Sequence, residues 1–301
     1  GLVAFAIGTE TLGSIVSPCT RCGTTGLRPT FGRVSRHGVM SLSFSMDKVG
    51  PIARTVEDCA LVFSAIAGKD PLDPVSVDGP PAWPARRGLS DLTIGFVEEL
   101  FQEERGKDAK SDEEKARAAE WRAFDLRTLD VLRGLGARLV PVKLPSRTPI
   151  APLSLVLTAE AAAEFDELVL DGRVKTMVRQ TADAWPNVFR QGRLVPAVDY
   201  LRAQRVRTLL MRETEECLAG VDLFVAPTYG GRSLLLTNLT GHPSVVVPNG
   251  FRLSDGTPTS VTFTGKLFGE SDLLAVADLY QRATDFHVRR PRLPDALPAN
   301  G

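Results

Sequence analysis

The feature that most constrains the fold of this chain is one long helical segment between two short apolar runs. The runs are residues 92–97 and 136–142. Between them, apolar residues recur at helical spacing on one face: Trp121, Phe124, Val131, Leu132 and Leu135. A strand, a long helix and a second strand form a βαβ unit, which places parallel strands in a sheet that helices cover. The sequence therefore predicts a layered α/β fold.

Further elements fit the same fold. Thr55 begins a capping-box pattern, and the apolar helical face that follows it includes Cys59 and ends near Gly68. Residues 155–215 are helical in character, and Ser271 is expected to cap a last helix. Short apolar runs predict three more strands, at residues 222–226, 244–247 and 261–264.

Composition excludes several functional classes. Lys plus Arg and Asp plus Glu are 36 each, so no basic field is available for nucleic acid or anionic lipid. No apolar run approaches the roughly 20 residues of a membrane span. Four cysteines cannot form a disulfide scaffold, which favours a cytoplasmic protein, and three histidines limit histidine chemistry. We expect no cofactor, no metal, no direct contact with nucleic acid and no membrane span.

The two ends of the chain differ in character. The first residues, Gly1 to Gly8, form an apolar segment without an initiating Met, which is typical of the interior of a domain. We therefore expect one domain over residues 1–290 whose N-terminal part is missing. Residues 291–301 hold three prolines and are predicted to be an unfolded tail.

Ser14 is the strongest local candidate for chemistry. It follows a run of small residues that lets backbone N–H groups approach a substrate oxygen closely. From composition alone, an ordinary loop serine bonded to its own backbone remains the first interpretation. The spacing also differs from the G-x-S-x-G elbow, because Gly13 directly precedes Ser14.

Three ordered blocks change that ranking. Gly8–Ile15 (GTETLGSI), Cys22–Ser35 (CGTTGLRPTFGRVS) and Asp47–Asp58 (DKVGPIARTVED) closely resemble the second half of the amidase signature. Weaker resemblance continues at residues 200–207, 237–244 and 263–284, so essentially the whole chain is covered. The chain is similar to the C-terminal portion of an amidase signature enzyme.

The resemblance implies an amide-bond hydrolase on an α/β fold with a mixed central sheet flanked by helices. Members of the family use a Ser–cis-Ser–Lys triad. Ser14 matches the nucleophile, and Thr11, Leu12 and Gly13 match the oxyanion-hole segment. The relay serine and the lysine match positions upstream of Gly1 and no residue of this chain. A neutral lysine acting through a serine hydroxyl needs no histidine, which fits the three histidines.

The chain departs from the family pattern at three positions. Leu12 and Val16 stand where many members have glycine and arginine, and Glu10 replaces an aspartate. Because leucine loses easy access to positive φ, we expect Leu12 to change the shape of the oxyanion hole.

Two other functions stay open. The first is the glutaminase subunit of a tRNA-dependent amidotransferase, although that subfamily's glutamine-binding motif is not found around residues 187–199. The second is a non-catalytic remnant that acts as a binding domain. We expect a small-molecule amide as substrate, apolar or aryl rather than glutamine, partly because of the apolar run 234–236. Homo-oligomerisation stays open, and the fragment alone is expected to be inactive and poorly stable.

Other reactive residue types favour structural roles. Cys19 and Cys22 form a single C-x-x-C without further ligands. His242 is predicted to be structural or pocket-lining, and His37 and His287 to lie on the surface. Asp47 and Asp199 are predicted to cap helices or form ion pairs. The resemblance gives Lys48 no catalytic role.

Overall fold

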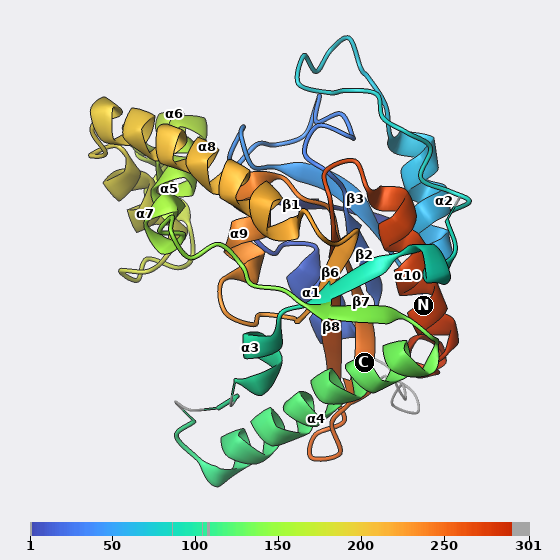
Figure 1. Ribbon diagram of the computed structural model, residues 1–301. Coiled ribbons are helices and arrows are strands. Elements are labelled where there is room, and N and C mark those ends of the chain that lie inside the picture. The colour runs from blue at the N-terminus through green and yellow to red at the C-terminus, as the bar shows by residue number, and fades with distance from the viewer. Residues whose placement is uncertain (1, 86, 104, 107–108, 291–301) are drawn as a thin grey trace, which may run out of the picture.

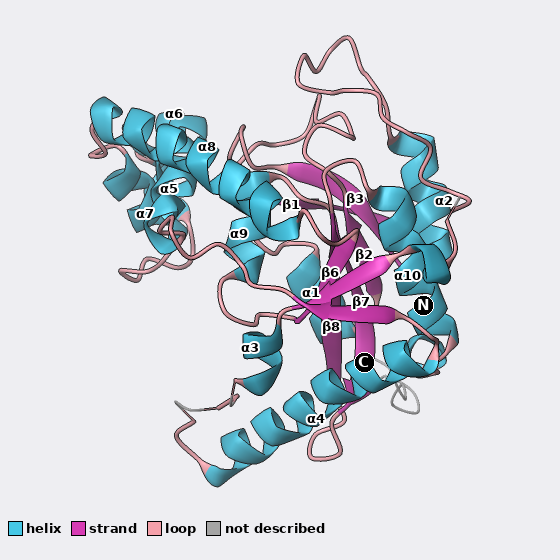
Figure 2. Ribbon diagram, viewed as in Figure 1, coloured by secondary structure: helices cyan, strands magenta, loops and turns pink. Residues whose placement is uncertain are grey.

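The computed structural model describes residues 2–85, 87–103, 105–106 and 109–290. Their centre is one mixed sheet of eight strands in the order β1-β3-β2-β7-β8-β6-β4-β5 (Figures 1 and 2). The strands are β1 (Phe5–Glu10), β2 (Thr25–Arg28), β3 (Lys48–Ala53), β4 (Thr93–Phe96), β5 (Arg138–Pro141), β6 (Leu223–Pro227), β7 (Ser244–Phe251) and β8 (Pro258–Gly265). The predicted α/β class is confirmed.

The predicted βαβ unit is present. β4 pairs in parallel with β5, starting with Thr93 opposite Arg138, and also in parallel with β6. The crossover helix is α4 (Asp112–Gly134). The other strand pairs are antiparallel, which makes the sheet mixed.

Helices cover both faces of the sheet. On one face, α2 (Val56–Ile66), α4 and α10 (Glu270–Arg282) share a buried apolar cluster with Val245 and Val247 of β7. On the other face, α1 (Val16–Cys22) packs on Val246. This alternation follows from the two-residue period of a strand, and it places α1 directly against the sheet.

A group of helices stands to one side of the sheet (Figure 1). It comprises α5 (Ser154–Glu164), α6 (Asp166–Leu170), α7 (Trp185–Gly192) and α8 (Ala197–Leu218), which we call the helical lobe. α5 and α7 approach closely at Gly192, where a Cβ atom would lie 2.4 Å from the carbonyl oxygen of Thr158. Only glycine fits there. The short helix α9 (Ser233–Thr240) lies between the lobe and the sheet, whereas α3 (Glu98–Gln102) lies near β6 and α4, away from the lobe.

The structure confirms one of the two predicted helix caps and contradicts the other. The Thr55 hydroxyl accepts a hydrogen bond from the Asp58 N–H at 3.0 Å, as predicted for the start of α2. The prediction for Ser271 is wrong, because α10 begins at Glu270 with Gly269 as its N-cap. The Glu270 carboxylate instead accepts the N–H of Thr30 at 2.9 Å. The predicted tail, residues 291–301, lies outside the described residues.

The first strand lies at the edge of the sheet. β1 pairs with β3 and ends the strand order, and its apolar Phe5 and Ile7 are 49% and 48% exposed. Within the described residues, no helix has the length and apolar character needed to cross a membrane.

Candidate active site

Ser14 lies in a tight turn between β1 and α1, and it is exposed to solvent. The turn depends on Gly13, whose φ is +95°. A Cβ atom on Gly13 would also lie 3.0 Å from the side chain of Leu234. Among the described residues the positive φ of this turn belongs to Gly13 and not to Leu12. A leucine at position 12 therefore needs no positive φ in this turn, which removes the reason for expecting it to change the shape of the oxyanion hole.

The carboxylate of Glu10 holds this turn by binding backbone N–H groups at the start of α1. One of its oxygens accepts the N–H groups of Ile15 and Val16, both at 2.9 Å, at the start of α1. The other accepts Arg28 at 2.7 Å and Asn238 at 2.8 Å. Burial acts to raise the pKa of Glu10, but the Arg28 guanidinium and these hydrogen bonds lower it to about 2. Glu10 is therefore an anion that fixes the orientation of α1 relative to β1.

Arg28 extends the same buried network. It is completely buried and donates to the hydroxyls of Thr237 and Ser244 and to the carbonyl of His242. Both terminal nitrogens of Arg28 are therefore bonded, which restricts the buried ion pair to few geometries, whereas its Nε has no partner among the described residues. The network thus joins β1, α1, β2, α9 and β7 beneath the turn.

A second carboxylate holds the turn from the side. The Thr11 hydroxyl donates to one oxygen of Asp47. The other oxygen of Asp47 accepts the N–H groups of Leu42 and Ser43 at 2.7 and 2.9 Å. Asp47 thus organises the loop before β3, and the prediction that it caps a helix or forms an ion pair is wrong.

The turn leaves four backbone donors free. The N–H groups of Thr11, Leu12, Gly13 and Ser14 donate to no acceptor in the described part of the chain. Preorganised N–H groups of this kind stabilise the negative charge that develops on a carbonyl oxygen during acyl transfer. The segment that the resemblance matched to an oxyanion hole therefore has the donors that such a site needs.

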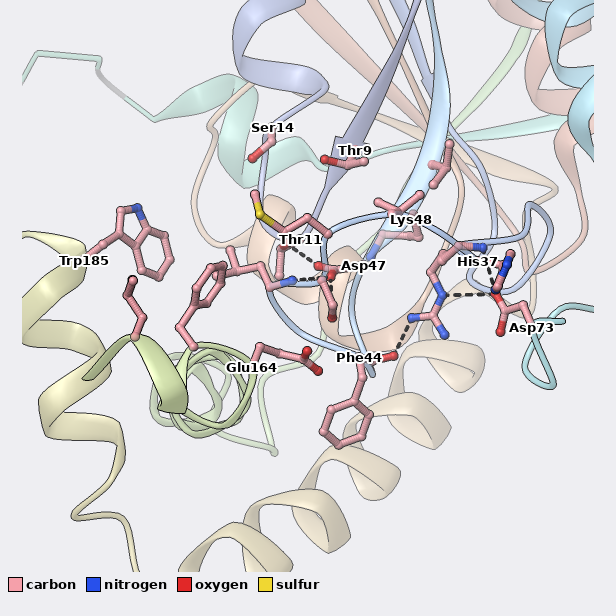
Figure 3. A pocket seen from close by; sticks show the side chains of 18 of the residues that line it. Thr9, Thr11, Ser14, His37, Phe44, Asp47, Lys48, Asp73, Glu164 and Trp185 are labelled. Atoms are coloured by element: carbon pink, nitrogen blue, oxygen red, sulfur yellow. Dashed lines mark hydrogen bonds and ion pairs between the residues drawn. The ribbon is translucent and has the colours of Figure 1, made fainter. Parts of the chain in front are cut away.

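A cavity of about 660 Å³ opens in front of Ser14, as Figure 3 shows. The loop of residues 36–47 and the start of β3 line one side of it. The helical lobe and the segment between α6 and α7 line the other with apolar side chains: Phe165, Leu168, Met177, Trp185 and Phe189. The rings of Phe165 and Phe189 stack at 4.7 Å, and those of Trp185 and Phe189 at 5.6 Å. The wall opposite the loop thus combines three aromatic rings with Leu168, Met177 and the carboxylate of Glu164.

One lysine lines the same cavity. Lys48 is 2% exposed, and its ammonium donates to the carbonyl of Met46. Burial, and then the nearby Arg28 guanidinium, lower the pKa of Lys48 well below its usual value.

Comparison with known proteins identifies the family. The family model described as amidase matches residues 1–236. The chain belongs to the amidase family. It is 36% identical to one component of the glutamyl-tRNA(Gln) amidotransferase of Chloroflexus aurantiacus, and 35% identical to an amidase of Pseudomonas putida. Both matches cover 97% of this chain, but only 66% and 65% of the two relatives. The chain thus spans about two thirds of the length of the curated relatives it matches.

Solved structures of amidases share the fold. The peptide amidase of Stenotrophomonas maltophilia superposes with a TM-score of 0.74 at 28% identity, over 98% of this chain and 65% of that protein. The expected amidase fold with a mixed central sheet is therefore confirmed.

The histidines of this amidase chain lie in three different environments. His37 is exposed, as predicted, but also lines the large cavity. His287 is half-buried, so it reaches the surface only in part. His242 is buried, and its Nδ1 lies 2.7 Å from the Thr240 hydroxyl. Burial, and then Arg28, lower the pKa of His242 to about 4, so it is neutral at pH 7 and forms no ion pair with Glu215 at 3.4 Å.

The cysteines are free thiols. Cys19 is buried in α1, and its burial raises its pKa to about 12, whereas Cys22 is exposed. Cys59 is buried in the core as predicted. Among the described residues, no three His, Cys, Asp or Glu side chains gather in a group that could hold a metal ion. Asp199 lies in the first turn of α8 and 3.6 Å from Arg202, as predicted.

Sequence reasoning missed the residues that shape the cavity in front of Ser14. The apolar run 234–236 lies in α9, where Leu236 is buried in the core and Leu234 packs on Gly13. Neither residue lines the cavity, so that argument for an apolar substrate is wrong. The aromatic wall comes instead from Phe165, Trp185 and Phe189. The four-residue spacing of Trp185 and Phe189 was the available signal.

Proposed function

We propose that this chain is the nucleophile-bearing part of an amide hydrolase and that Ser14 is the nucleophile. The observation that carries the proposal is the turn itself. It places the exposed Ser14 side chain in the lining of a large cavity, next to backbone N–H groups that have no partner in the described part of the chain. The buried anion Glu10 and the loop-bound Asp47 hold this turn from two sides.

In the proposed reaction, the Ser14 oxygen attacks the carbonyl carbon of an amide and loses its proton to a base. The negative charge that forms on the carbonyl oxygen is stabilised by the N–H groups of Leu12, Gly13 and Ser14. The tetrahedral intermediate collapses, the C–N bond breaks, and the protonated amine leaves an acyl group on Ser14. Water then hydrolyses this ester and releases the acid.

The base that accepts the proton of Ser14 is, in this proposal, not one of residues 1–301. The resemblance supplies a relay serine and a lysine that match no residue of this chain, so we propose that residues 1–301 alone hydrolyse no amide. Lys48 is the alternative, because it is buried beside the same cavity with a lowered pKa. A Lys48→Met variant separates the two: full-length enzyme with this change should keep its turnover if the base lies elsewhere.

We propose an amide with an apolar or aryl acyl group as substrate. Stacked aromatic rings form one wall of the cavity, and such a wall favours an uncharged, flat or apolar group. The rival is the glutaminase component of an amidotransferase, and relatives from amidotransferases are as similar to this chain as the amidase of Pseudomonas putida. Free glutamine carries two charged groups that need partners. Arg36, which lines the cavity, already lies 3.5 Å from Asp73.

The test compares two neighbouring serines in the full-length enzyme. Ser14→Ala should abolish release of ammonia or amine, with a loss of about 10⁴-fold or more in kcat, as for other serine nucleophiles. Ser17→Ala should keep near-normal turnover, because the Ser17 hydroxyl is already engaged with Tyr229 at 2.9 Å. Near-normal turnover of Ser14→Ala would sink the assignment. A clear preference for glutamine over aryl amides would favour the amidotransferase.

A further inference from the structure

A second cavity lies within the helical lobe, next to the one in front of Ser14. Its volume is about 420 Å³. Small side chains on α5 and around the α7–α8 connection form much of its wall: Ala159, Ala162, Ala163, Gly192, Val195 and Ala197. The cavity exists because small residues occupy the positions where larger side chains would fill the space between these helices.

The charged groups of the second cavity are already paired. Glu160 is buried and accepts hydrogen bonds from Ser43, Ser45, Tyr200 and Gln204. The other acidic group, Asp166, forms an ion pair with Arg193. A charged group without partners would call for a polar ligand, but Glu160 is held by these neutral donors and Asp166 by Arg193. The lining therefore suits an uncharged apolar group.

Phe44 connects the two cavities. It lines both of them, and it is 50% exposed. Figure 3 shows its ring directed away from Asp47 and from the polar end of the first cavity. The backbone around Phe44 is fixed, because Asp47 holds Ser43 on one side and Glu160 holds Ser45 on the other. Movement at this junction therefore falls to the Phe44 side chain.

We propose that the second cavity binds the distal alkyl or aryl end of an amide whose carbonyl lies at Ser14, and that Phe44 divides the two sites. This inference rests on the proposed amide hydrolysis. It assigns the length preference of the enzyme to the small residues of α5. Each further methylene buried in the second cavity should raise kcat/KM about fourfold, the equivalent of about 0.8 kcal/mol.

The experiment fills the second cavity without touching the first. Ala163 is suited to this, because it lines the second cavity but is exposed, so a larger side chain does not overpack the core. Full-length wild type, Ala163→Phe and Phe44→Ala are assayed with p-nitroanilides whose acyl groups lengthen from acetyl to octanoyl. Ala123→Phe is the matched control, at an exposed position of α4 away from both cavities.

Ala163→Phe should lower kcat/KM for the octanoyl substrate by about tenfold or more, a loss of two or more buried methylenes, and leave the acetyl substrate within about twofold. Phe44→Ala should shift the preference towards longer chains, and Ala123→Phe should match wild type. Identical chain-length profiles for wild type and Ala163→Phe would overturn this inference and leave the proposed hydrolysis standing. Failure of wild type to hydrolyse any of these anilides would contradict both.

Discussion

The turn that carries Ser14 and the helical lobe opposite it are built on different principles. The turn is held by buried polar groups: Glu10 bonds to both Arg28 and the start of α1, and Asp47 bonds to Thr11. The lobe meets the cavity with stacked rings, and α5 and α7 pack through small residues. Directional bonds fix atoms to within fractions of an ångström, whereas apolar walls accept several shapes.

This contrast predicts separate roles for the turn and the lobe in the proposed reaction. Changes under the turn should alter stability and the rate of the proposed chemical step, since they move Ser14, the proposed nucleophile, or the neighbouring N–H groups. Changes in the lobe should alter which amide binds, with little effect on the rate for a small amide. Variants on each side of this division can test it.

The largest effect is expected from Glu10→Gln. This change leaves Arg28 buried without its anion, so the free energy of unfolding should fall by about 3–5 kcal/mol. Denaturant unfolding of the full-length enzyme measures it. The control is Glu57→Gln, which removes a half-exposed partner of Arg282 and should cost no more than about 1 kcal/mol. Equal losses in the two variants would show that the buried pair has no special role.

The same carboxylate predicts a dependence on pH. The pKa of Glu10 is lowered from 4.5 to about 2 in the folded chain, so its contribution is complete above pH 4.5. The contribution is lost as pH falls from there towards 2, because the unfolded state then binds the proton more readily. Unfolding measured across this range should show a smaller slope for Glu10→Gln than for wild type. An unchanged slope would mean that other groups dominate acid unfolding.

A smaller effect is expected from Thr11→Val, which keeps the shape of the side chain and removes its bond to Asp47. Without this bond, the N–H groups of the oxyanion segment should be held less firmly in place. We therefore expect kcat to fall about 10- to 100-fold, with KM nearly unchanged. Thr11→Ser restores the hydroxyl and should recover most of the rate. If Thr11→Ser is as slow as Thr11→Val, the hydroxyl is not what positions the segment.

The smallest effect is expected in the lobe. Trp185→Ala removes the outer ring of the aromatic stack, so KM for an aryl amide should rise about 3- to 10-fold. KM for a short aliphatic amide should stay within about twofold of the wild-type KM, because a small acyl group does not reach the aromatic wall of the cavity. Steady-state kinetics with the two substrates measures both. A drop in kcat for both substrates would contradict the claim that the lobe affects substrate preference and the turn affects the chemical rate.

The fold was largely predictable, because its signals are local and periodic. The strand–helix–strand pattern identified β4, α4 and β5, and Thr55 marked the start of α2. The helix α1 was missed, because it has only seven residues with Pro18 in its first turn and no apolar stripe. Ser271 failed as a cap because Gly269 and the long-range partner Thr30 decide where α10 begins.

The site was predictable only where one short segment carries it. Ser14 and the segment from Thr11 to Gly13 are contiguous, so a motif is enough to propose them. The bond from Thr11 to Asp47 spans 36 positions, and that from Arg28 to Thr237 spans 209. Pairing across such distances is set by strand order, and a single sequence contains no local signal of it. The lobe is harder still, because helical spacing does not tell which apolar side chains face a cavity.

Covalent modification of Ser14 tests its role as the nucleophile most directly. Full-length enzyme treated with a serine-reactive aryl phosphonate should carry one adduct, found by peptide mass spectrometry on the segment that contains Ser14. Amidase activity should fall in proportion to this adduct, and the Ser14→Ala variant should not be labelled. Loss of activity with Ser14 unmodified, or full activity with Ser14 completely labelled, would contradict its role as the nucleophile.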